Sequence, residues 1–275
     1  MPITHAIVLG IVQGLTEFLP ISSSGHLLLV PWLFGWDDFE SADVEKTFAV
    51  ALHLGTLIAV VGYFWQDVKV YVTEGLKAVF TRGPASPDGR LAWLFVLATI
   101  PAAVVGALFE GTIDDRLGSP TIIAVSLIVF GVALGWADRL PGTRKLADFN
   151  TRDALTVGAA QALALNPGTS RSGITMTAAR AVRFDRDAAV RISFLMSIPV
   201  ILGALVFKGA GLVADGVPED LVVPMIVGVI TSALAGWLAI WGLLKFVQTR
   251  SFLPFVIYRV VLGVVILLLV ATGAR

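Results

Sequence analysis

The sequence predicts an all-α protein that crosses a membrane several times, and three observations lead to this fold class. Of its 275 residues, 56% are hydrophobic and 15% are charged, and the mean hydropathy is +0.85. A soluble domain carries roughly 25% charged residues, so this chain has too few to cover a water-facing surface. The apolar residues also gather in long windows, with the charged residues between them. The bilayer is therefore the expected solvent.

Six apolar windows are long enough to cross the hydrocarbon core as α-helices, which takes about 20 residues. Each window is bounded by polar sequence or by sequence rich in Pro and Gly. We therefore expect six transmembrane helices, at about 47–65, 91–109, 119–137, 191–208, 221–244 and 252–273.

Two further apolar stretches, 3–34 and 153–182, do not have the pattern of a simple span. Each is interrupted near its middle by Pro, Gly and consecutive hydroxyl residues. Irregular backbone at membrane depth is tolerated only where protein or a water-filled cavity surrounds it. We therefore expect each stretch to be a re-entrant helix pair that enters and leaves the membrane on one side.

The charges between the windows predict the orientation. The basic connections contain Lys69, Lys77, Arg82, Arg90, Arg139, Arg144, Lys145, Arg152, Arg180, Arg183, Arg186, Arg191, Lys245 and Arg250. The alternate connections are acidic or mixed and contain Asp37, Asp38, Glu40, Asp43, Glu45, Glu110, Asp114, Asp115, Asp215, Glu219 and Asp220. The positive-inside rule assigns the basic set to the cytoplasm, and this works only if both broken stretches are re-entrant. We expect the four arginines between 180 and 191 to anchor the cytoplasmic face near anionic lipid.

The two halves of the chain resemble each other. Five residues recur 148 positions later: Gly10, Gln13, Ser22, Ser24 and Gly25 match Gly158, Gln161, Ser170, Ser172 and Gly173. Each half would contain one broken pair and three spans, and an odd number of spans gives the halves opposite orientation. We expect one membrane domain over 1–275, made of two inverted-topology repeats, 1–140 and 150–275.

Charge and composition exclude several classes of function. The formal net charge is zero, which gives no basic field for nucleic acid. The chain has no cysteine, so it can form neither a disulfide framework nor a thiolate metal site.

The first motif, residues Gln13–His26, gathers groups that can carry chemistry. Gln13 and Glu17 are four residues apart and share one helix face. Pro20 would end that helix, and the serines at 22–24 suit the N-cap of the next one. A helix start rich in hydroxyls is an anion site. A buried Glu17 is costly unless it is paired, solvated or bound to a metal.

The second motif, residues Asn166–Thr175, repeats this design and adds Arg171. Arginine offers planar, bidentate recognition of phosphate oxygens. The repeat symmetry would bring Arg171 towards Glu17 and His26 from the opposite side. A carboxylate, an imidazole, a guanidinium and several hydroxyls would then converge at membrane depth, which favours phosphoryl transfer.

These two motifs resemble the two signatures of the bacterial undecaprenyl-pyrophosphate phosphatase family, the bacitracin-resistance proteins. The resemblance extends over essentially the whole chain in length, span pattern and motif separation. It implies hydrolysis of undecaprenyl pyrophosphate to the monophosphate lipid carrier in the bacterial cytoplasmic membrane, with a divalent cation (Mg²⁺ or Ca²⁺) and a site open to the outer face. It places the family's acidic pair on Gln13 and Glu17, its Ser/His elements on Ser22, Ser23 and His26, and its basic motif on Ser170, Arg171 and Thr175.

Several roles stay open at this point. Some members carry Glu where Gln13 stands, so Glu17, with Gln13 beside it, is the expected cation ligand. Ser23, His26 or water could attack phosphorus, and Ser22 and Ser24 could be helix caps. We expect Arg171 to clamp phosphate. Among the substrate contacts we include Gln13, Ser22, Ser170, Ser172 and Thr175, with capping and packing as their alternative roles.

Two wider alternatives are kept. Inverted repeats with broken helices are also a transporter plan, so a polyprenyl-phosphate transporter or flippase is the second hypothesis. A scaffolding role would leave the intramembrane Glu17 and Arg171 unexplained. For His53, which lies inside a predicted span, we expect hydrogen bonding between helices. A homodimer is kept as the candidate assembly, with the polyprenyl pyrophosphate lipid and the bilayer as partners.

Overall fold

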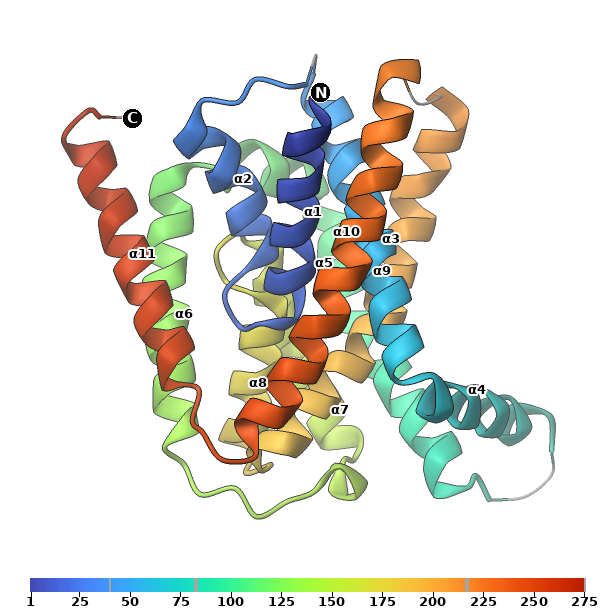
Figure 1. The fold of residues 1–275 in the computed structure, drawn as a ribbon. Coiled ribbons are helices and arrows are strands. Elements are labelled where there is room, and N and C mark those ends of the chain that lie inside the picture. Colours follow the sequence, from blue (N-terminus) through green and yellow to red (C-terminus); the bar gives the residue numbers. More distant parts are fainter. Residues whose placement is uncertain (40, 82–83, 216–217, 275) are drawn as a thin grey trace.

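A computed structural model describes residues 1–39, 41–81, 84–215 and 218–274, without the side chains of 42, 110–116 and 208–215. The described chain is helical (Figure 1). The helices are α1 (Ile3–Phe18), α2 (Ser23–Phe34), α3 (Ala42–Tyr63), α4 (Trp65–Phe80), α5 (Pro87–Arg116), α6 (Pro120–Asp138), α7 (Thr151–Ala162), α8 (Arg171–Ala181), α9 (Arg186–Asp215), α10 (Glu219–Val247) and α11 (Leu253–Ala271). Of the charged side chains used above for orientation, those of Glu40, Arg82, Glu110, Asp114, Asp115 and Asp215 lie outside this description.

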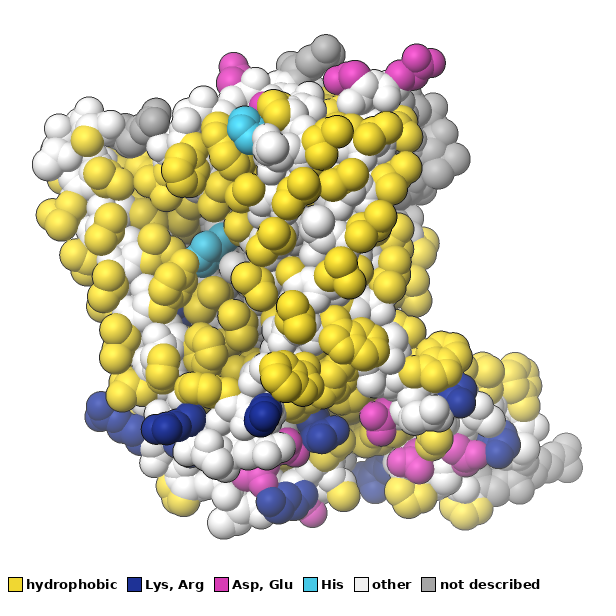
Figure 2. Space-filling model, viewed as in Figure 1, with side chains coloured by type: hydrophobic (Ala, Val, Ile, Leu, Met, Phe, Trp, Pro, Cys, Tyr) yellow, Lys and Arg dark blue, Asp and Glu magenta, His cyan; other side chains and the backbone are white. Residues whose placement is uncertain are grey.

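The six predicted spans are confirmed. Six helices are long and apolar enough to cross a membrane: Asp43–Tyr63, Pro87–Phe109, Pro120–Asp138, Arg186–Phe207, Glu219–Phe246 and Leu253–Ala271. In Figure 2 their apolar side chains form a broad band, and on this face the Lys and Arg side chains gather at the end opposite both termini. The chain is therefore a multi-pass membrane protein.

The two broken stretches each form a pair of short helices. In Figure 1, α1 and α2 run from the end that carries the termini to mid-height and back, and α7 and α8 do the same from the other end. The breaks at 19–22 and 163–170 thus meet inside the bundle. α1 packs against α10, and α7 packs against α5.

Both breaks end on a serine with left-handed backbone. Ser22 has φ 79° and Ser170 has φ 72°, which is rare for residues other than glycine. Each serine is the N-cap of the helix that follows, with its Oγ accepting from the backbone N–H three residues later: Gly25 for Ser22 and Gly173 for Ser170. These caps confirm the serine caps predicted from the sequence, and such strain persists only where surrounding structure holds it.

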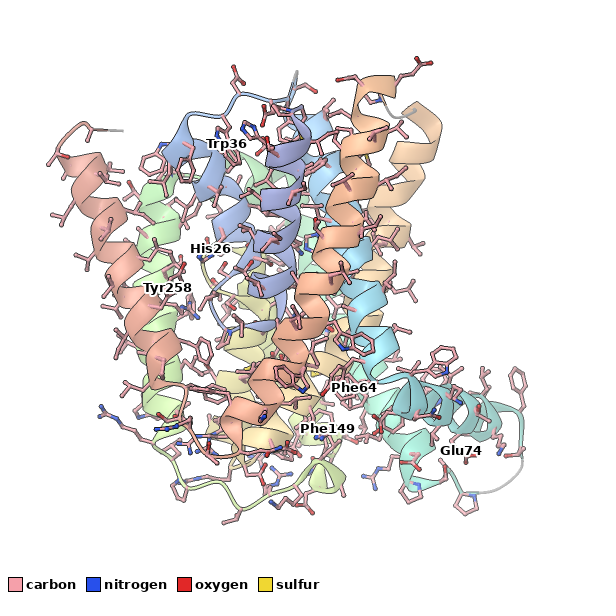
Figure 3. All side chains as sticks on the ribbon, in the orientation of Figure 1. His26, Trp36, Phe64, Glu74, Phe149 and Tyr258 are labelled. Carbon is pink, nitrogen blue, oxygen red and sulfur yellow. The ribbon has the colours of Figure 1, made fainter. Side chains whose placement is uncertain are left out.

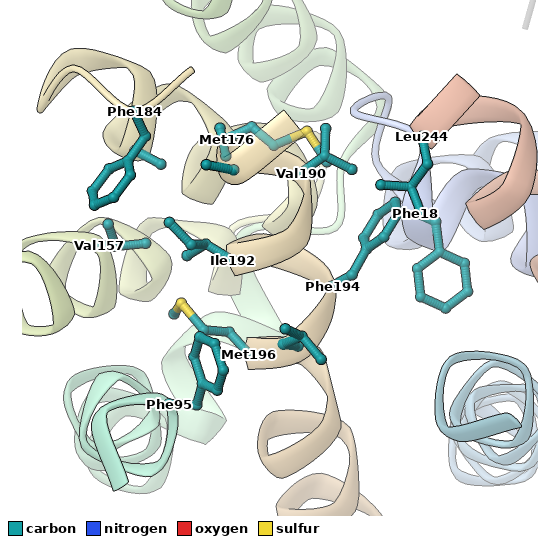
Figure 4. Close-up of a cluster of buried hydrophobic side chains, with 14 of the residues drawn as sticks. Phe18, Phe95, Val157, Met176, Phe184, Val190, Ile192, Phe194, Met196 and Leu244 are labelled. Carbon is teal, nitrogen blue, oxygen red and sulfur yellow. The ribbon is translucent and has the colours of Figure 1, made fainter. Parts of the chain in front are cut away.

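The core that holds these pairs is centred on α9. Its buried side chains include Phe18 from α1, Phe95 from α5, and Ile192, Phe194 and Met196 from α9 (Figure 4). Phe18 and Phe194 pack edge to face with ring centroids 5.3 Å apart. This packing fixes the end of α1, which carries Glu17, against the helix that carries the carbonyl partner of Arg171.

Arg259 on α11 ties the two breaks together. Its side chain is 0% exposed, and its guanidinium donates to the carbonyls of Pro20 (3.3 Å), Gly168 (3.0 Å) and Thr169 (2.9 Å), as well as Leu127 on α6 (3.1 Å). Lipid cannot satisfy these buried carbonyls, so the guanidinium supplies their donors. Gly173 leaves it room, because a Cβ there would lie 2.8 Å from Arg259 Nη1.

The expectation that the four arginines between 180 and 191 face anionic lipid is wrong for Arg180. Its side chain is 4% exposed and donates to the carbonyls of Phe184 (2.6 Å), Asp138 (3.0 Å) and Leu140. Arg186 pairs with the Asp138 carboxylate at 2.6 Å. The buried carboxylate at the end of α6 needs these cations, and the pattern of loop charges did not reveal that need.

Replacing Arg259 by Met should destabilise the fold, because it leaves several buried carbonyl oxygens without donors. Each unsatisfied group costs about 1–3 kcal/mol, so we expect the melting temperature in detergent to fall by roughly 5–10 °C. The exposed Arg250, replaced by Met, is the control and should melt like wild type. Equal melting of both variants would contradict the role assigned to Arg259.

Candidate active site

The two motifs interlock where the breaks meet. Ser22 Oγ accepts from Gly168 N at 3.0 Å, and Ser172 Oγ donates to the Leu19 carbonyl at 3.0 Å. Each contact joins residues about 150 positions apart and links one break to the other. The site is thus built from both halves of the chain.

Glu17 is the centre of the polar cluster. Its carboxylate is 6% exposed and accepts from Ser23 Oγ at 2.6 Å, from Arg171 Nη2 at 2.8 Å and from Gln13 Nε2 at 3.2 Å. The expected meeting of Glu17 with Arg171 is therefore confirmed. A buried carboxylate with three donors, one of them cationic, is fixed in position and held in its charged form.

Contacts with α9 and within α8 fix the position of Arg171. Its Nη1 donates to the Ser193 carbonyl at 2.9 Å, and its own carbonyl lies 2.8 Å from Thr175 Oγ1. Thr175 is fully buried and also lies 2.8 Å from Ser193 Oγ. This geometry supports a positioning role for Thr175. Arg171 places one guanidinium beside the carboxylate of Glu17, and the guanidinium of Arg259 is buried at the two helix breaks. Two cations at the breaks favour an anionic ligand.

Ser22 and Ser23 are placed for different tasks. Both lone pairs of the Ser22 hydroxyl accept backbone N–H groups, from Gly25 and Gly168. Ser23 instead donates its proton to Glu17 and keeps its own lone pairs for a reacting centre. A hydroxyl bonded to a carboxylate in this way is set up for deprotonation. Ser170 and Ser172 are buried, like Ser22, and frame the second break.

The described hydrogen-bond partners of the His26 ring lie outside the Glu17 cluster. Its Nδ1 lies 2.7 Å from the Ser22 carbonyl, and its Nε2 lies 2.7 Å from the hydroxyl of Tyr258 on α11 (Figure 3). The first turn of α2 turns the ring towards α11, because Ser22, four residues earlier, holds Nδ1. His26 shares a helix face with Ser23, three residues before it.

Sequence reasoning missed two groups near the site besides Arg259. His53 Nδ1 bonds the Ala49 carbonyl of its own helix at 2.7 Å, and its Nε2 lies 3.7 Å from Glu17 Oε2. The expected bond between helices is thus replaced by an approach to the central carboxylate. An ionisable side chain within a span was the available signal for His53 and for Arg259. Tyr258 gave no comparable signal.

The described residues contain no group of three or more His, Asp or Glu side chains that could hold a metal ion. One feature nevertheless suits a hard cation. Within the described chain, the amide oxygen Oε1 of Gln13 is buried and has no hydrogen-bond partner. The amide nitrogen of the same Gln13 side chain donates to the Glu17 carboxylate, so this oxygen lies close to that carboxylate.

Comparisons with known proteins identify the family of the chain. The family profile described as "Bacitracin resistance protein BacA" matches residues 6–265. The chain belongs to this bacitracin resistance protein family. Relatives from Desulforudis audaxviator and Moorella thermoacetica are 49% and 47% identical to it, over 96% and 97% of this chain and 97% of each relative. A third, from Hahella chejuensis, is 48% identical over 94% of both chains, and all three are named undecaprenyl-diphosphatase.

In this family member, Glu17→Ala and Arg171→Ala should each destabilise the protein, because each leaves a buried charge without its partner, at a cost of about 3–5 kcal/mol. The double variant should lose less than the sum of the two, since neither charge is then left. Thermal unfolding in detergent measures this coupling. Replacing exposed Lys77, which pairs with Glu74 at 2.7 Å, is the control and should change stability little. Strictly additive losses at Glu17 and Arg171 would contradict a buried ion pair.

Proposed function

We propose that this protein is an integral-membrane phosphatase that hydrolyses undecaprenyl pyrophosphate to undecaprenyl phosphate and inorganic phosphate. This activity would recycle the lipid carrier of cell-wall synthesis and confer bacitracin resistance. The observation that carries the proposal is the Ser23 hydroxyl, which donates to Glu17 at 2.6 Å beside the guanidinium of Arg171. The names of the relatives, undecaprenyl-diphosphatase, supply the substrate class.

In the first step, Ser23 Oγ attacks the terminal phosphorus and its proton passes to Glu17. The bond between that phosphorus and the bridging oxygen breaks, and undecaprenyl phosphate leaves. Arg171 stabilises the charge that develops on the phosphate oxygens, as guanidinium groups do in phosphoryl transfer.

In the second step, water attacks the phosphoserine. His26 Nε2 takes a proton from the water, and the proton on Glu17 returns to Ser23 Oγ as the phosphorus–oxygen bond breaks. Inorganic phosphate leaves, and the proton on His26 passes to it or to water. Because His26 follows Ser23 by one helical turn, it can serve the phosphoryl group that Ser23 holds.

A divalent cation, Mg²⁺ or Ca²⁺, is part of the proposal. Glu17 and the unpartnered Oε1 of Gln13 would be its protein ligands, and phosphate oxygens and water would complete an oxygen-only shell. When bound, it would neutralise charge on the pyrophosphate. One carboxylate with substrate oxygens is a usual arrangement for Mg²⁺.

The proposed topology is a single domain of two inverted repeats, 1–140 and 150–275, each with a re-entrant pair. Three features support it: the matching caps at Ser22 and Ser170, the helix pairs that start from opposite ends in Figure 1, and the basic end in Figure 2. The positive-inside rule then puts the basic end in the cytoplasm. The bacterial cytoplasmic membrane as location and a site open to the outer face are proposed from the family alone. The homodimer stays a prediction, which light scattering of the solubilised protein tests.

The transporter or flippase hypothesis uses the same midplane site. It is not favoured, because the relatives carry the name of a hydrolase and because Ser23 and Glu17 form a nucleophile–base pair that transport does not need.

Purified protein in detergent should release phosphate from a C55 polyprenyl pyrophosphate, and a chelator should suppress the release. Ser23→Ala should lower kcat at least about 10³-fold, because the nucleophile is lost. The neighbouring Ser24→Ala, which is exposed, is the matched control and should stay within about threefold of wild type. Wild-type protein that transports the lipid in liposomes without releasing phosphate would overturn the proposal.

Single cysteines, placed in this cysteine-free chain, test the orientation. A membrane-impermeant thiol reagent added to intact spheroplasts should modify Asp37→Cys at once and Lys145→Cys only after permeabilisation. The reverse pattern would invert the proposed topology, and labelling of both before permeabilisation would contradict it.

A further inference from the structure

The contact between His26 and Tyr258 lies at the edge of the site, on the bilayer side. Tyr258 is 43% exposed, whereas His26 is 7% exposed. The two rings are stacked, with centroids 5.7 Å apart and planes 12° from parallel. In Figure 3 both side chains lie between α2 and α11 at mid-height, where Figure 2 shows a histidine in a hollow of the apolar face. We name this hollow the lateral mouth.

The partners of His26 fix its tautomer. A backbone carbonyl can only accept, so the nitrogen 2.7 Å from the Ser22 carbonyl, Nδ1, carries the proton. In the neutral ring, Nε2 then has the lone pair, and the Tyr258 hydroxyl at 2.7 Å is its donor. The basic nitrogen of His26 is thus directed at the lateral mouth.

We propose that Tyr258 is a positioning residue of the phosphatase: by donating to Nε2 and stacking on the ring, it holds His26 in the Nδ1–H tautomer with its basic nitrogen at the mouth. This inference rests on the proposed function of His26 as proton acceptor. Water or a phosphate oxygen that displaces the phenol would find Nε2 already oriented. Without the hydroxyl, Nε2 loses its hydrogen-bond donor, so the ring can turn or change tautomer despite the Ser22 contact and the stacking.

The position of Tyr258 also suits a lipid substrate. Its neighbours on α11, Ile257 and Val261, are both exposed apolar side chains. A polyprenyl chain lying along this surface would leave its pyrophosphate at mid-height, next to the polar hydroxyl of Tyr258. Tyr258 would therefore already orient His26 when the pyrophosphate headgroup reaches Ser23.

The direct test uses Tyr258→Phe, which removes the hydroxyl and keeps the ring. The chain has three histidines, so ¹⁵N-histidine spectra of the detergent-solubilised protein can be assigned with single variants such as His26→Gln. In Tyr258→Phe, the Nε2 resonance of His26 should move towards that of a free imidazole nitrogen, and the Nδ1–H tautomer should lose population. Tyr63→Phe is the matched control, because the Tyr63 ring packs on Trp237. Unchanged His26 resonances in Tyr258→Phe would overturn the proposal.

Kinetics separates positioning from an independent role. Tyr258→Phe should lower kcat about three- to tenfold, the effect of one hydrogen bond, with KM within about twofold. In the His26→Gln background the same change should cost nothing further, because Tyr258 acts through His26. An equal loss in both backgrounds would contradict positioning and assign Tyr258 its own contact with substrate. Wild-type protein without phosphatase activity would instead refute the proposed function, and the spectra would still test the tautomer.

Discussion

Arg259 is the constraint on which the rest of the structure depends. Two helix breaks at membrane depth expose carbonyl groups that lipid cannot satisfy, and one buried guanidinium supplies donors to both. A carboxylate in its place would repel these carbonyls, and a lysine has fewer donors and no planar fork. The guanidinium therefore lets the chain keep irregular backbone next to Glu17. Among the described residues, Arg259 forms no ion pair, and its positive charge would favour an anionic ligand.

Ser22 and Ser23, adjacent residues of the first motif, make different hydrogen bonds at the start of α2. The Ser22 hydroxyl accepts hydrogen bonds from two backbone N–H groups and so stabilises the turn. The hydroxyl of the next residue, Ser23, instead donates to Glu17. The strained backbone of Ser22 turns its carbonyl towards His26 and its hydroxyl towards the second motif. The strain at the break thereby orients the Ser22 carbonyl and the Ser22 hydroxyl, and contacts from both halves hold it.

Much of this could be predicted from sequence because the signals are local. Hydropathy marks the spans, and Pro20 and the serines mark the breaks. The predicted repeat led us to expect Arg171 near Glu17, and the two side chains do pair. His53, Tyr258 and Arg259 could not be placed, because they reach the site only through the packing of α3 and α11, and hydropathy does not specify which face of a uniformly apolar helix turns inward. Arg180 was misassigned for the same reason: its buried partner Asp138 is distant in sequence. The partner of His26 Nε2 could not be predicted either, because the Tyr258 hydroxyl reaches it from another helix, 232 residues away in sequence.

Detection of the covalent intermediate tests the central claim most directly. Protein mixed with C55 polyprenyl pyrophosphate should be quenched within one turnover, in acid, where phosphoserine survives, and in alkali, where phosphohistidine survives. Mass spectrometry of the peptide that contains both residues then locates the phosphoryl group. We predict that it lies on Ser23 after the acid quench, and that it accumulates when His26 is replaced by Gln. A phosphoryl group on His26, or turnover with no modified peptide in either quench, would contradict the account of Ser23 as the nucleophile that Glu17 activates.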